Sequence, residues 1–283
     1  MKLNPVDAEN TTRVKKIAIL GCGAIGSRIA RSVNQELREH CSLSGLYDID
    51  PRKISELEES LSPVMSLARS SFLDLLRDCD VLVEAINAPD TGDFIRMALE
   101  SRRDVLTMSV GKLLQADDLL SLASHNNCSL LIPSGAIAGI DAVKSACLAS
   151  VDAITLTTRK PASGFFDNEY IESRGIDLNA IKGETCLFEG TVDDAVRYFP
   201  RNINVAATLA LASHAKSKIR IRIVTSPEYT INSHEIDIRG DFGHMVSRTE
   251  NVTCPDNPKT SYLAVLSAIQ TLKEFCSGSR VGT

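Results

Sequence analysis

The sequence predicts an α/β protein in two parts: an N-terminal doubly wound parallel sheet and a C-terminal α+β domain with a mixed or antiparallel sheet. Three observations support this prediction. Short apolar runs alternate with amphipathic stretches from residue 14 to residue 133, a glycine-rich turn follows the first apolar run, and the hydrophobic period changes after Pro133. The length of 283 residues allows about two domains, each with its own core.

Five apolar runs in the N-terminal part are expected to be strands. The runs are nearly continuous in apolar residues, which is typical of strands that are covered on both faces. They lie at 17–20, 43–47, 81–86, 105–110 and 129–132. Helical patterns separate them, for example Ile25, Ile29 and Val33 at intervals of four residues. This alternation predicts parallel strands that are joined by helices.

The C-terminal part has a different period. Residues 218–224 (KIRIRIV) alternate between polar and apolar side chains, which predicts a strand with one wet face and one buried face. A second strand is predicted at 229–239. The division expected from these patterns is an N-terminal domain at 1–133, a second domain at 134–256 and a final helical segment at 257–283.

The final segment is predicted to contain one long helix at 260–275. Four of its apolar residues recur every three positions, namely Leu263, Leu266, Ile269 and Leu272. Such a stripe must face another surface. We expect it to pack back toward the N-terminal domain.

The composition argues against several classes of protein. With 31 Lys and Arg against 36 Asp and Glu, the net charge is −5, which offers no basic surface to a nucleic acid. No stretch reaches the ~18 apolar residues of a membrane span, and the first 15 residues lack the apolar core of a signal peptide. The eight cysteines form no C-x-x-C pair, so no metal site is predicted and most should be buried free thiols. We therefore expect a cytoplasmic protein without nucleic-acid or membrane partners.

The glycine-rich turn is the sharpest local signal. It reads Gly21-Cys22-Gly23-Ala24-Ile25-Gly26, directly after the first predicted strand and at the start of a helix. In this context, which is that of a Rossmann dinucleotide-binding domain, the glycines permit a tight turn, close approach of a pyrophosphate and close helix–strand packing. The predicted cofactor-binding residues here are Gly21, Gly23, Ala24, Ile25 and Gly26. The alternative is a glycine-rich turn that binds no ligand.

Asp48 supports the cofactor interpretation. It lies at the end of the second predicted strand, about 20 residues beyond the glycines, where an acidic side chain accepts hydrogen bonds from the ribose hydroxyls of NAD. A 2′-phosphate would be repelled there, although Arg52 and Lys53 lie near enough to compensate in part. The predicted cofactor is therefore NAD or NADP.

Two further residues are candidates for the chemistry. Asn204 belongs to the run FPRNINVAA, where either it or Asn202 could equally be an ordinary helix cap. His234 shares the buried side of a predicted strand with Ile236, and an imidazole is well suited to proton transfer near neutral pH. A hydrogen-bonded core histidine is the alternative for His234, and His244 is its competitor.

Together, these motifs closely resemble the L-aspartate dehydrogenase family. The resemblance covers nearly the whole chain, and the motifs occur in both predicted domains. They are GCGAIG at 21–26, PSGAIAGIDA at 133–142, LTTRKP at 156–161, FPRNINVAA at 199–207, NSHEI at 232–236 and NPKTS at 257–261.

The resemblance implies NAD(P)-dependent oxidation of L-aspartate to iminoaspartate, an oxidation at a CH–NH2 group. Iminoaspartate then gives oxaloacetate and ammonia or is passed on to NAD biosynthesis, and the reverse amination is also implied. The family's catalytic histidine matches His234, and its cofactor-contacting alanine and asparagine match Ala136 and Asn204. The family also suggests a homodimer. The implied domain roles are cofactor binding for 1–133 and substrate binding and catalysis for 134–256.

A substrate with two carboxylates needs cationic or amide partners. By motif, the candidates are Lys160, Lys259 and the backbone that begins at Ser134, with Arg159 beside them. The alternative for each basic residue is a solvated surface charge. The sequence departs from the family pattern in two places, at Asn87-Ala88-Pro89-Asp90-Thr91 and at Lys112. These departures put the coenzyme preference and the rate in doubt more than the reaction class.

Two other functions remain open at this stage. One is a related two-domain reductase of another substrate, such as a homoserine dehydrogenase, because such enzymes share the dinucleotide half. The other is a sensor that binds NAD(P) but has lost catalysis. Turnover of NADH with oxaloacetate and ammonium would separate the enzyme from the sensor.

Overall fold

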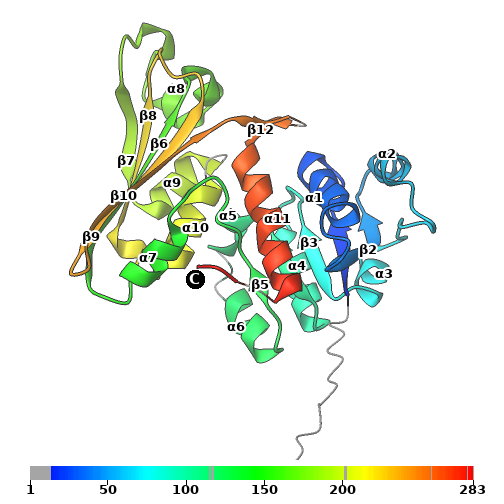
Figure 1. The fold of residues 1–283 in the computed structure, drawn as a ribbon. Coiled ribbons are helices and arrows are strands. Elements are labelled where there is room, and N and C mark those ends of the chain that lie inside the picture. Colours follow the sequence, from blue (N-terminus) through cyan, green and yellow to red (C-terminus); the bar gives the residue numbers. More distant parts are fainter. Residues whose placement is uncertain are drawn as a thin grey trace, which may run out of the picture.

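Two five-stranded sheets organise the chain (Figure 1). The structure, a computed structural model, describes residues 14–114, 116, 118–200, 203–255, 257–278 and 280–282, and of residues 257–259 it describes the backbone alone. None of the helices within these ranges combines the length and apolar character needed to cross a bilayer.

The first sheet is parallel throughout. Its strands are β1 (Lys15–Leu20), β2 (Cys41–Tyr47), β3 (Val81–Glu84), β4 (Asp104–Thr107) and β5 (Leu130–Leu131). Their order is β2-β1-β3-β4-β5, and every neighbouring pair is parallel. The predicted doubly wound parallel sheet is thus confirmed.

Helices cover both faces of this sheet. Ile17 and Ile19 point into a core formed with α1 (Ala24–Asn34), α2 (Pro51–Leu61) and α11 (Tyr262–Ser277). Ala18 and Leu20 point to the other face. The helices there are α3 (Phe72–Arg77), α4 (Thr91–Glu100), α5 (Val110–Leu113) and α6 (Asp118–His125). This two-sided cover explains why the strands are apolar at nearly every position.

β3 and β4 end two or three residues earlier than their apolar runs predict. β3 stops at Glu84 and β4 at Thr107, and Val110 already belongs to α5. The Glu84 carboxylate accepts hydrogen bonds from the backbone N–H groups of Ile86 (2.9 Å) and Ser109 (3.1 Å), so these groups do not bond to a neighbouring strand. Beyond the strand ends, Ile86 and Val110 are apolar because they pack on the core of the sheet.

The second sheet is mixed. Its strands are β6 (Val151–Lys160), β7 (Thr185–Gly190), β8 (Ile219–Thr225), β9 (Asn232–Gly240) and β10 (Gly243–Asn251). Their order is β10-β9-β6-β8-β7; β6 and β8 are parallel, and the other neighbours are antiparallel. The predicted alternation at 218–224 appears in β8, where Ile219, Ile221 and Ile223 are buried and Arg220 is exposed.

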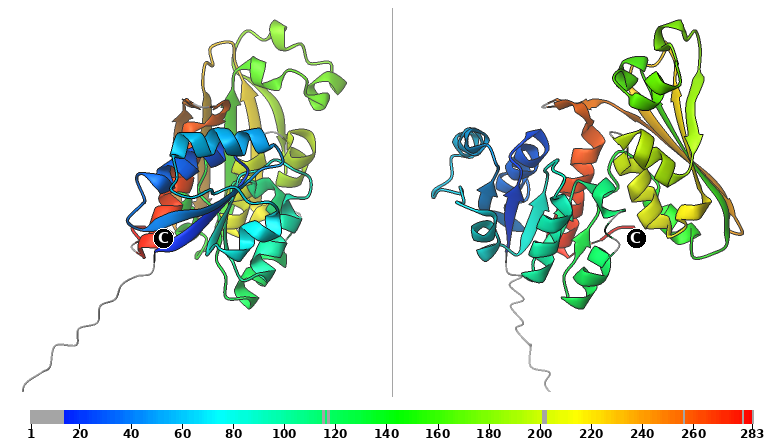
Figure 2. Two further views of the ribbon diagram at one scale, coloured as in Figure 1. Left: turned by 90° about the vertical axis from the view of Figure 1, so that its right-hand side faces the viewer. Right: turned by 180° about the vertical axis from the view of Figure 1, so that it is seen from behind.

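One face of the second sheet is covered and the other is charged. The helices α7 (Ile140–Ala146), α9 (Val192–Tyr198) and α10 (Ile203–Ser213) lie on the face toward the first sheet (Figure 2), and α8 (Glu169–Ser173) packs at one end. On the opposite face, the Arg159–Glu235 and Arg222–Glu189 ion pairs each have a separation of 3.3 Å.

The chain returns to the first sheet at its end. After the short strands β11 (Thr253–Cys254) and β12 (Asn257–Ser261), helix α11 packs beside α1, with Val265, Ala268 and Leu272 fully buried in the first core. The stripe expected from the sequence was wrong for two of its four residues, since Leu263 and Leu266 are 38% and 39% exposed. This helix is apolar on two faces, and only one of them meets the sheet.

Candidate functional site

The glycine-rich turn links β1 to α1 at the carboxyl edge of the first sheet. Gly21 has a φ of +97°, and a Cβ there would lie 2.6 Å from the carbonyl oxygen of Ala85. A Cβ on Gly26 would lie 1.8 Å from the carbonyl oxygen of Gly21. Both glycines are therefore required by the packing of the protein itself.

Gly23 is different, because apart from Gly23 and its two chain neighbours no protein atom lies within 4 Å of the position its Cβ would take. Gly23 is the N-cap of α1, its backbone lies at the start of the helix and no side chain caps it. Ala24 and Ile25 form the first turn, which contains no acidic residue. An open, uncapped helix N-terminus is suited to a phosphate, so the turn fits the pyrophosphate of a dinucleotide.

Asp48 lies beside this turn. Its carboxylate accepts hydrogen bonds from the backbone N–H of Cys22 at 2.8 Å and of Asp50 at 2.9 Å, and only 7% of its side chain is exposed. A carboxylate has about four acceptor positions, so two backbone bonds leave acceptors for ribose hydroxyls. Burial raises the pKa of the adjacent Cys22 thiol to about 12, so that thiol is unreactive at neutral pH.

A cavity of about 410 Å³ borders Asp48, with Tyr47, Ile54 and Ala68 among its lining residues. Of the two cations noted from the sequence, Arg52 pairs with Asp50 at 3.0 Å, and the Lys53 ammonium lies 3.7 Å from Asp48. The cavity size and the carboxylate fit an adenosine with free ribose hydroxyls.

Asn204 joins the two halves of the molecule. It lies in the first turn of α10, yet its side chain does not cap that helix. Instead its Oδ1 accepts a hydrogen bond from the Gly111 N–H at 2.9 Å, and its Nδ2 donates to the Met108 carbonyl at 3.2 Å. The helix-cap alternative therefore does not apply to Asn204, and Asn202 lies outside the described residues.

Ala136 is held against β10, the strand that pairs with the strand of His234. Its carbonyl accepts hydrogen bonds from Thr249 Oγ1 at 2.8 Å and Asn251 Nδ2 at 3.0 Å, and Thr249 is the β10 partner of His234. The preceding Gly135 donates its N–H to Ser267 Oγ on α11 at 3.0 Å. The PSGAIAG segment is thereby fixed between the second sheet and α11.

His234 is a buried histidine on the covered face of the second sheet. It is 6% exposed, and its Nδ1 lies 3.0 Å from Thr158 Oγ1 of the neighbouring strand. Burial, aided by the charge of Lys160, lowers the pKa of His234 to about 3, so the imidazole is neutral near pH 7. The competitor His244 lies on the charged face, half exposed and 3.1 Å from Asp237.

Lys160 and Arg159 point to opposite faces of β6. Lys160 shares the face of Thr158 and His234 and is half-buried, and burial lowers the pKa of its ammonium to about 8. Arg159 faces away and pairs with Glu235 at 3.3 Å and Glu184 at 3.6 Å. Lys160 thus lies where a substrate anion near His234 could reach it, and Arg159 does not. The side chain of Lys259 lies outside the described residues.

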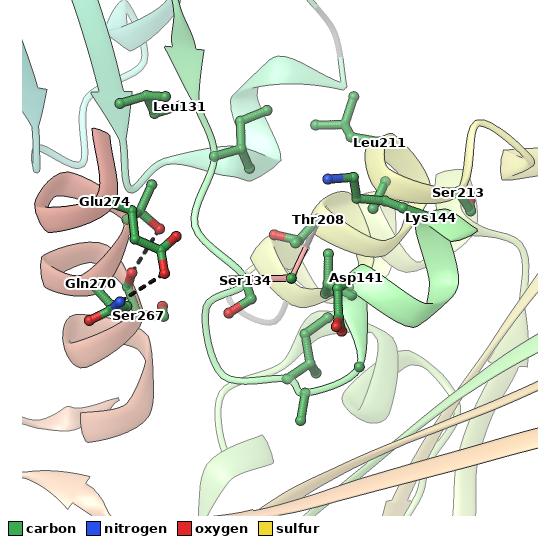
Figure 3. Close-up of a pocket in the computed structure, with 18 of the residues that line it drawn as sticks. Leu131, Ser134, Asp141, Lys144, Thr208, Leu211, Ser213, Ser267, Gln270 and Glu274 are labelled. Carbon is green, nitrogen blue, oxygen red and sulfur yellow. Dashed lines mark hydrogen bonds between the residues drawn. The ribbon is translucent and has the colours of Figure 1, made fainter. Parts of the chain in front are cut away.

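Ser134 lines a larger cavity, of about 1010 Å³, between α11, α7 and α10 (Figure 3). Figure 3 shows Ser134 on the segment between these helices, with Thr208 and Asp141 beside it and the Gln270–Glu274 hydrogen bond on α11. Within the described ranges, the lining includes neither His234 nor Lys160 nor Asn204. Ser134 is thus placed on a cavity whose lining does not include the histidine.

Several residues of the site gave no signal in the sequence. Thr158 and Thr249 are neighbours of His234 only through strand pairing, and Glu84 contacts Ser109 only because β3 and β4 end side by side. A single sequence does not show which strands are adjacent. The LTTRKP run contained Thr158, but nothing in it distinguished Thr158 from Thr157.

Family models match both halves of the chain. Residues 21–133 match the NAD-binding domain described for homoserine dehydrogenase, and residues 141–275 match the C-terminal domain of aspartate dehydrogenase. The second match, which includes His234 and Lys160, favours the aspartate dehydrogenase family over a related reductase such as a homoserine dehydrogenase.

Curated relatives match over almost their entire length. An L-aspartate dehydrogenase of Methanosarcina barkeri is 42% identical over 95% of this chain and 99% of its own, and one of Methanococcoides burtonii is 40% identical with the same coverage. Among solved structures, an aspartate dehydrogenase from Thermotoga maritima has a TM-score of 0.72 and 25% identity, over 95% of this chain and 99% of its own.

Proposed function

The chain belongs to the L-aspartate dehydrogenase family, and from this premise we propose that it oxidises L-aspartate with NAD(P). The amino acid loses a hydride from Cα and a proton from its amine, which gives iminoaspartate, NAD(P)H and a proton. Water then converts the imine to oxaloacetate and ammonia. The reverse reaction is the reductive amination of oxaloacetate.

The single observation that best supports this function is the position of His234. It is a neutral, buried imidazole on the face of the second sheet toward the first, with Thr158 at one ring nitrogen and Lys160 on the same face. When bound, the nicotinamide supplies the acceptor for the hydride. The residues at 21–26 and Asp48 hold the other end of the cofactor, and by resemblance Ala136 and Asn204 contact it.

His234 performs the proton transfers in this proposal. With Nδ1–H donating to Thr158 Oγ1, Nε2 is unprotonated and accepts the proton of the substrate amine. The protonated ring then returns a proton as water adds to the imine. Lys160 binds a substrate carboxylate as a cation, and Lys259 and the backbone at Ser134 are further candidates for the same task.

The division of labour follows the sequence. We propose that 1–133 binds the cofactor, 134–256 binds the substrate and contains the base, and 257–283 returns to the first core. We further propose a cytoplasmic homodimer that uses NAD or NADP and supplies pyridine nucleotide biosynthesis. Light scattering on the purified protein tests the dimer, and kcat/KM with each coenzyme tests the preference.

The test of the activity is NADH oxidation with oxaloacetate and ammonium, together with NAD reduction by L-aspartate. We expect turnover in both directions and none with homoserine. In His234→Asn, we expect NADH affinity within about twofold of the wild type and a turnover lower by about 10²-fold or more, the usual scale for an acid–base group. NADH binding without any turnover in the wild type would support the sensor instead, and turnover with homoserine would support the related reductase.

A further inference from the structure

Glu84 is a fully buried carboxylate that the proposed mechanism does not use. It ends β3 at 0% exposure. Its Oε1 accepts a hydrogen bond from the Ile86 N–H at 2.9 Å and lies 2.8 Å from Ser109 Oγ, whose single hydrogen is shared with the Ile86 carbonyl at 2.7 Å. Its Oε2 accepts from Thr107 Oγ1 at 2.6 Å and the Ser109 N–H at 3.1 Å. Four donors from two chain segments therefore converge on one side chain.

Burial of this carboxylate opposes folding. Desolvation raises the pKa of Glu84, although all four hydrogen bonds lower it, so the ionised form is held at a net disadvantage. A neutral, apolar side chain at the end of β3 would avoid this cost. The carboxylate has a structural role that offsets this cost, because its hydrogen bonds hold the segment after β3 against the segment after β4.

The segment after β4 in turn holds Asn204. The carbonyl of Met108 and the N–H of Gly111, on either side of Ser109, bond the two ends of the Asn204 amide at 3.2 Å and 2.9 Å. Contact between the segments is close, because a Cβ on Gly111 would lie 2.4 Å from Ile203 Cγ2. A continuous chain of hydrogen bonds and backbone thus runs from the buried carboxylate to the first turn of α10.

We propose that Glu84 is a positioning residue that fixes the 107–111 segment and, through it, the placement of Asn204 and α10 against the carboxyl edge of the first sheet. Glu84 touches neither substrate nor cofactor in this proposal. Because α10 belongs to the domain that contains His234, Glu84 helps to fix the distance between the cofactor-binding domain and His234. The kinetic part of this inference rests on the proposed function; the structural part does not.

The first test is Glu84→Gln, which keeps the shape but replaces one acceptor oxygen with an NH2 group. At least one of the four donors then faces another donor. We expect kcat to fall by about 10-fold or more, with the KM for L-aspartate and the Kd for NADH within about twofold, because small misplacement affects the reaction more than binding. Ser109→Ala, which removes one hydroxyl donor and keeps the carboxylate, should act in the same direction if Glu84→Gln folds poorly.

The matched control is Asp80→Asn. Asp80 precedes the opposite end of the same strand and accepts the Lys16 N–H at 2.8 Å, a bond that an asparagine oxygen can also accept. We expect its kcat to equal that of the wild type. An equal loss of kcat in both variants would mean that Glu84 acts only through general stability and would overturn the proposal.

A double-mutant cycle tests the route through Asn204. If Glu84 acts by placing Asn204, then Glu84→Gln should lower kcat by less than about twofold in an Asn204→Ala background. Additive losses would overturn the proposed route.

Hydrogen exchange of the cofactor-free protein gives a readout that does not depend on turnover. The peptide that contains Ser109 and Gly111 should exchange faster in Glu84→Gln than in the wild type. In Asp80→Asn its exchange rate should equal that of the wild type. An unchanged exchange rate in Glu84→Gln would overturn the inference, whichever substrate the enzyme uses. Faster exchange in a protein that does not oxidise aspartate would instead retain the inference and refute the proposed function.

Discussion

Burial shifts the protonation of His234 and Glu84 in the same direction, toward the neutral form. It lowers the pKa of His234 to about 3 and raises the pKa of Glu84. The consequences differ, because a neutral imidazole can accept a proton, whereas a carboxylate is useful to its four donors only while it is an acceptor. At the scale of single residues, the structure therefore combines an imidazole that burial keeps unprotonated with a carboxyl group whose ionised form burial disfavours.

His234 makes the stability of the folded protein depend on pH. Its pKa is 6.5 when unfolded and about 3 when folded, so between these values the unfolded chain binds more protons. The contribution to stability is fully present above pH ~6.5 and is lost as the pH falls toward ~3. Thermal unfolding of the wild type and of His234→Gln between pH 8 and pH 4 measures this. The Tm of the wild type should fall by more over this range than the Tm of the variant. A constant Tm difference between the two proteins across this range would contradict the assigned environment of the ring.

Thr158 sets the tautomer of the base. If Nδ1–H donates to Thr158 Oγ1, loss of the hydroxyl releases the ring and leaves a buried donor without its partner. We expect Thr158→Val to lower kcat/KM for L-aspartate by about 10-fold, the equivalent of ~1.4 kcal/mol. Thr158→Ser, which keeps the hydroxyl, should stay within about threefold. Similar values for the valine and serine variants would exclude this role.

At the scale of elements, the residues around the carboxyl edge of the first sheet lie at the ends of strands and helices. The glycine turn follows β1, Asp48 follows β2, Glu84 ends β3, and Asn204 lies in the first turn of α10. The carboxyl ends of parallel strands meet at one edge of a sheet, which is why residues far apart in sequence are brought together there.

The end of β2 should determine coenzyme preference. Asp48 keeps acceptor positions for ribose hydroxyls, and its charge repels a 2′-phosphate. In Asp48→Ala, we expect kcat/KM with NAD to fall by about 10-fold or more, and kcat/KM with NADP to fall less or to rise. Initial rates with both coenzymes measure this. An unchanged ratio would show that another residue reads the ribose.

The two apolar faces of α11 should differ in their contribution to stability. Leu272 is fully buried in the first core, whereas Leu266 is 39% exposed. Leu272→Ala should lower the free energy of unfolding by about 2–5 kcal/mol, and Leu266→Ala by less than ~1 kcal/mol. Chemical denaturation of both variants provides the comparison. Equal losses would mean that the outer face is also covered in solution.

At the scale of the whole molecule, the period of the sequence predicted most of the fold. Continuous apolar runs indicated the two-sided cover of the first sheet, and strict alternation indicated the one-sided cover of β8 and the buried position of His234. The stripe on α11 was wrong for Leu263 and Leu266, because a helix that is apolar on two faces does not reveal which face is covered.

The hydrogen-bonded part of the site was less accessible to prediction. Glu84 stood inside an apolar run that resembled an uninterrupted strand. Its partners come from the residue at the end of β4 and from the segments that follow β3 and β4. The partnership of Asn204 with Met108 and Gly111 spans almost one hundred positions and both halves of the chain. Such contacts depend on which elements are adjacent in space, and local periodicity contains no information about that.

The return of α11 to the first core has a consequence for biosynthesis. The N-terminal half emerges from the ribosome before Val265, Ala268 and Leu272 are translated, and the delay is on the order of 10 s. During that interval the apolar surface beside α1 that α11 later covers is exposed on the nascent chain and accessible to chaperones. Limited proteolysis of stalled nascent chains should find that half digestible until the final helix has emerged, and resistant afterwards.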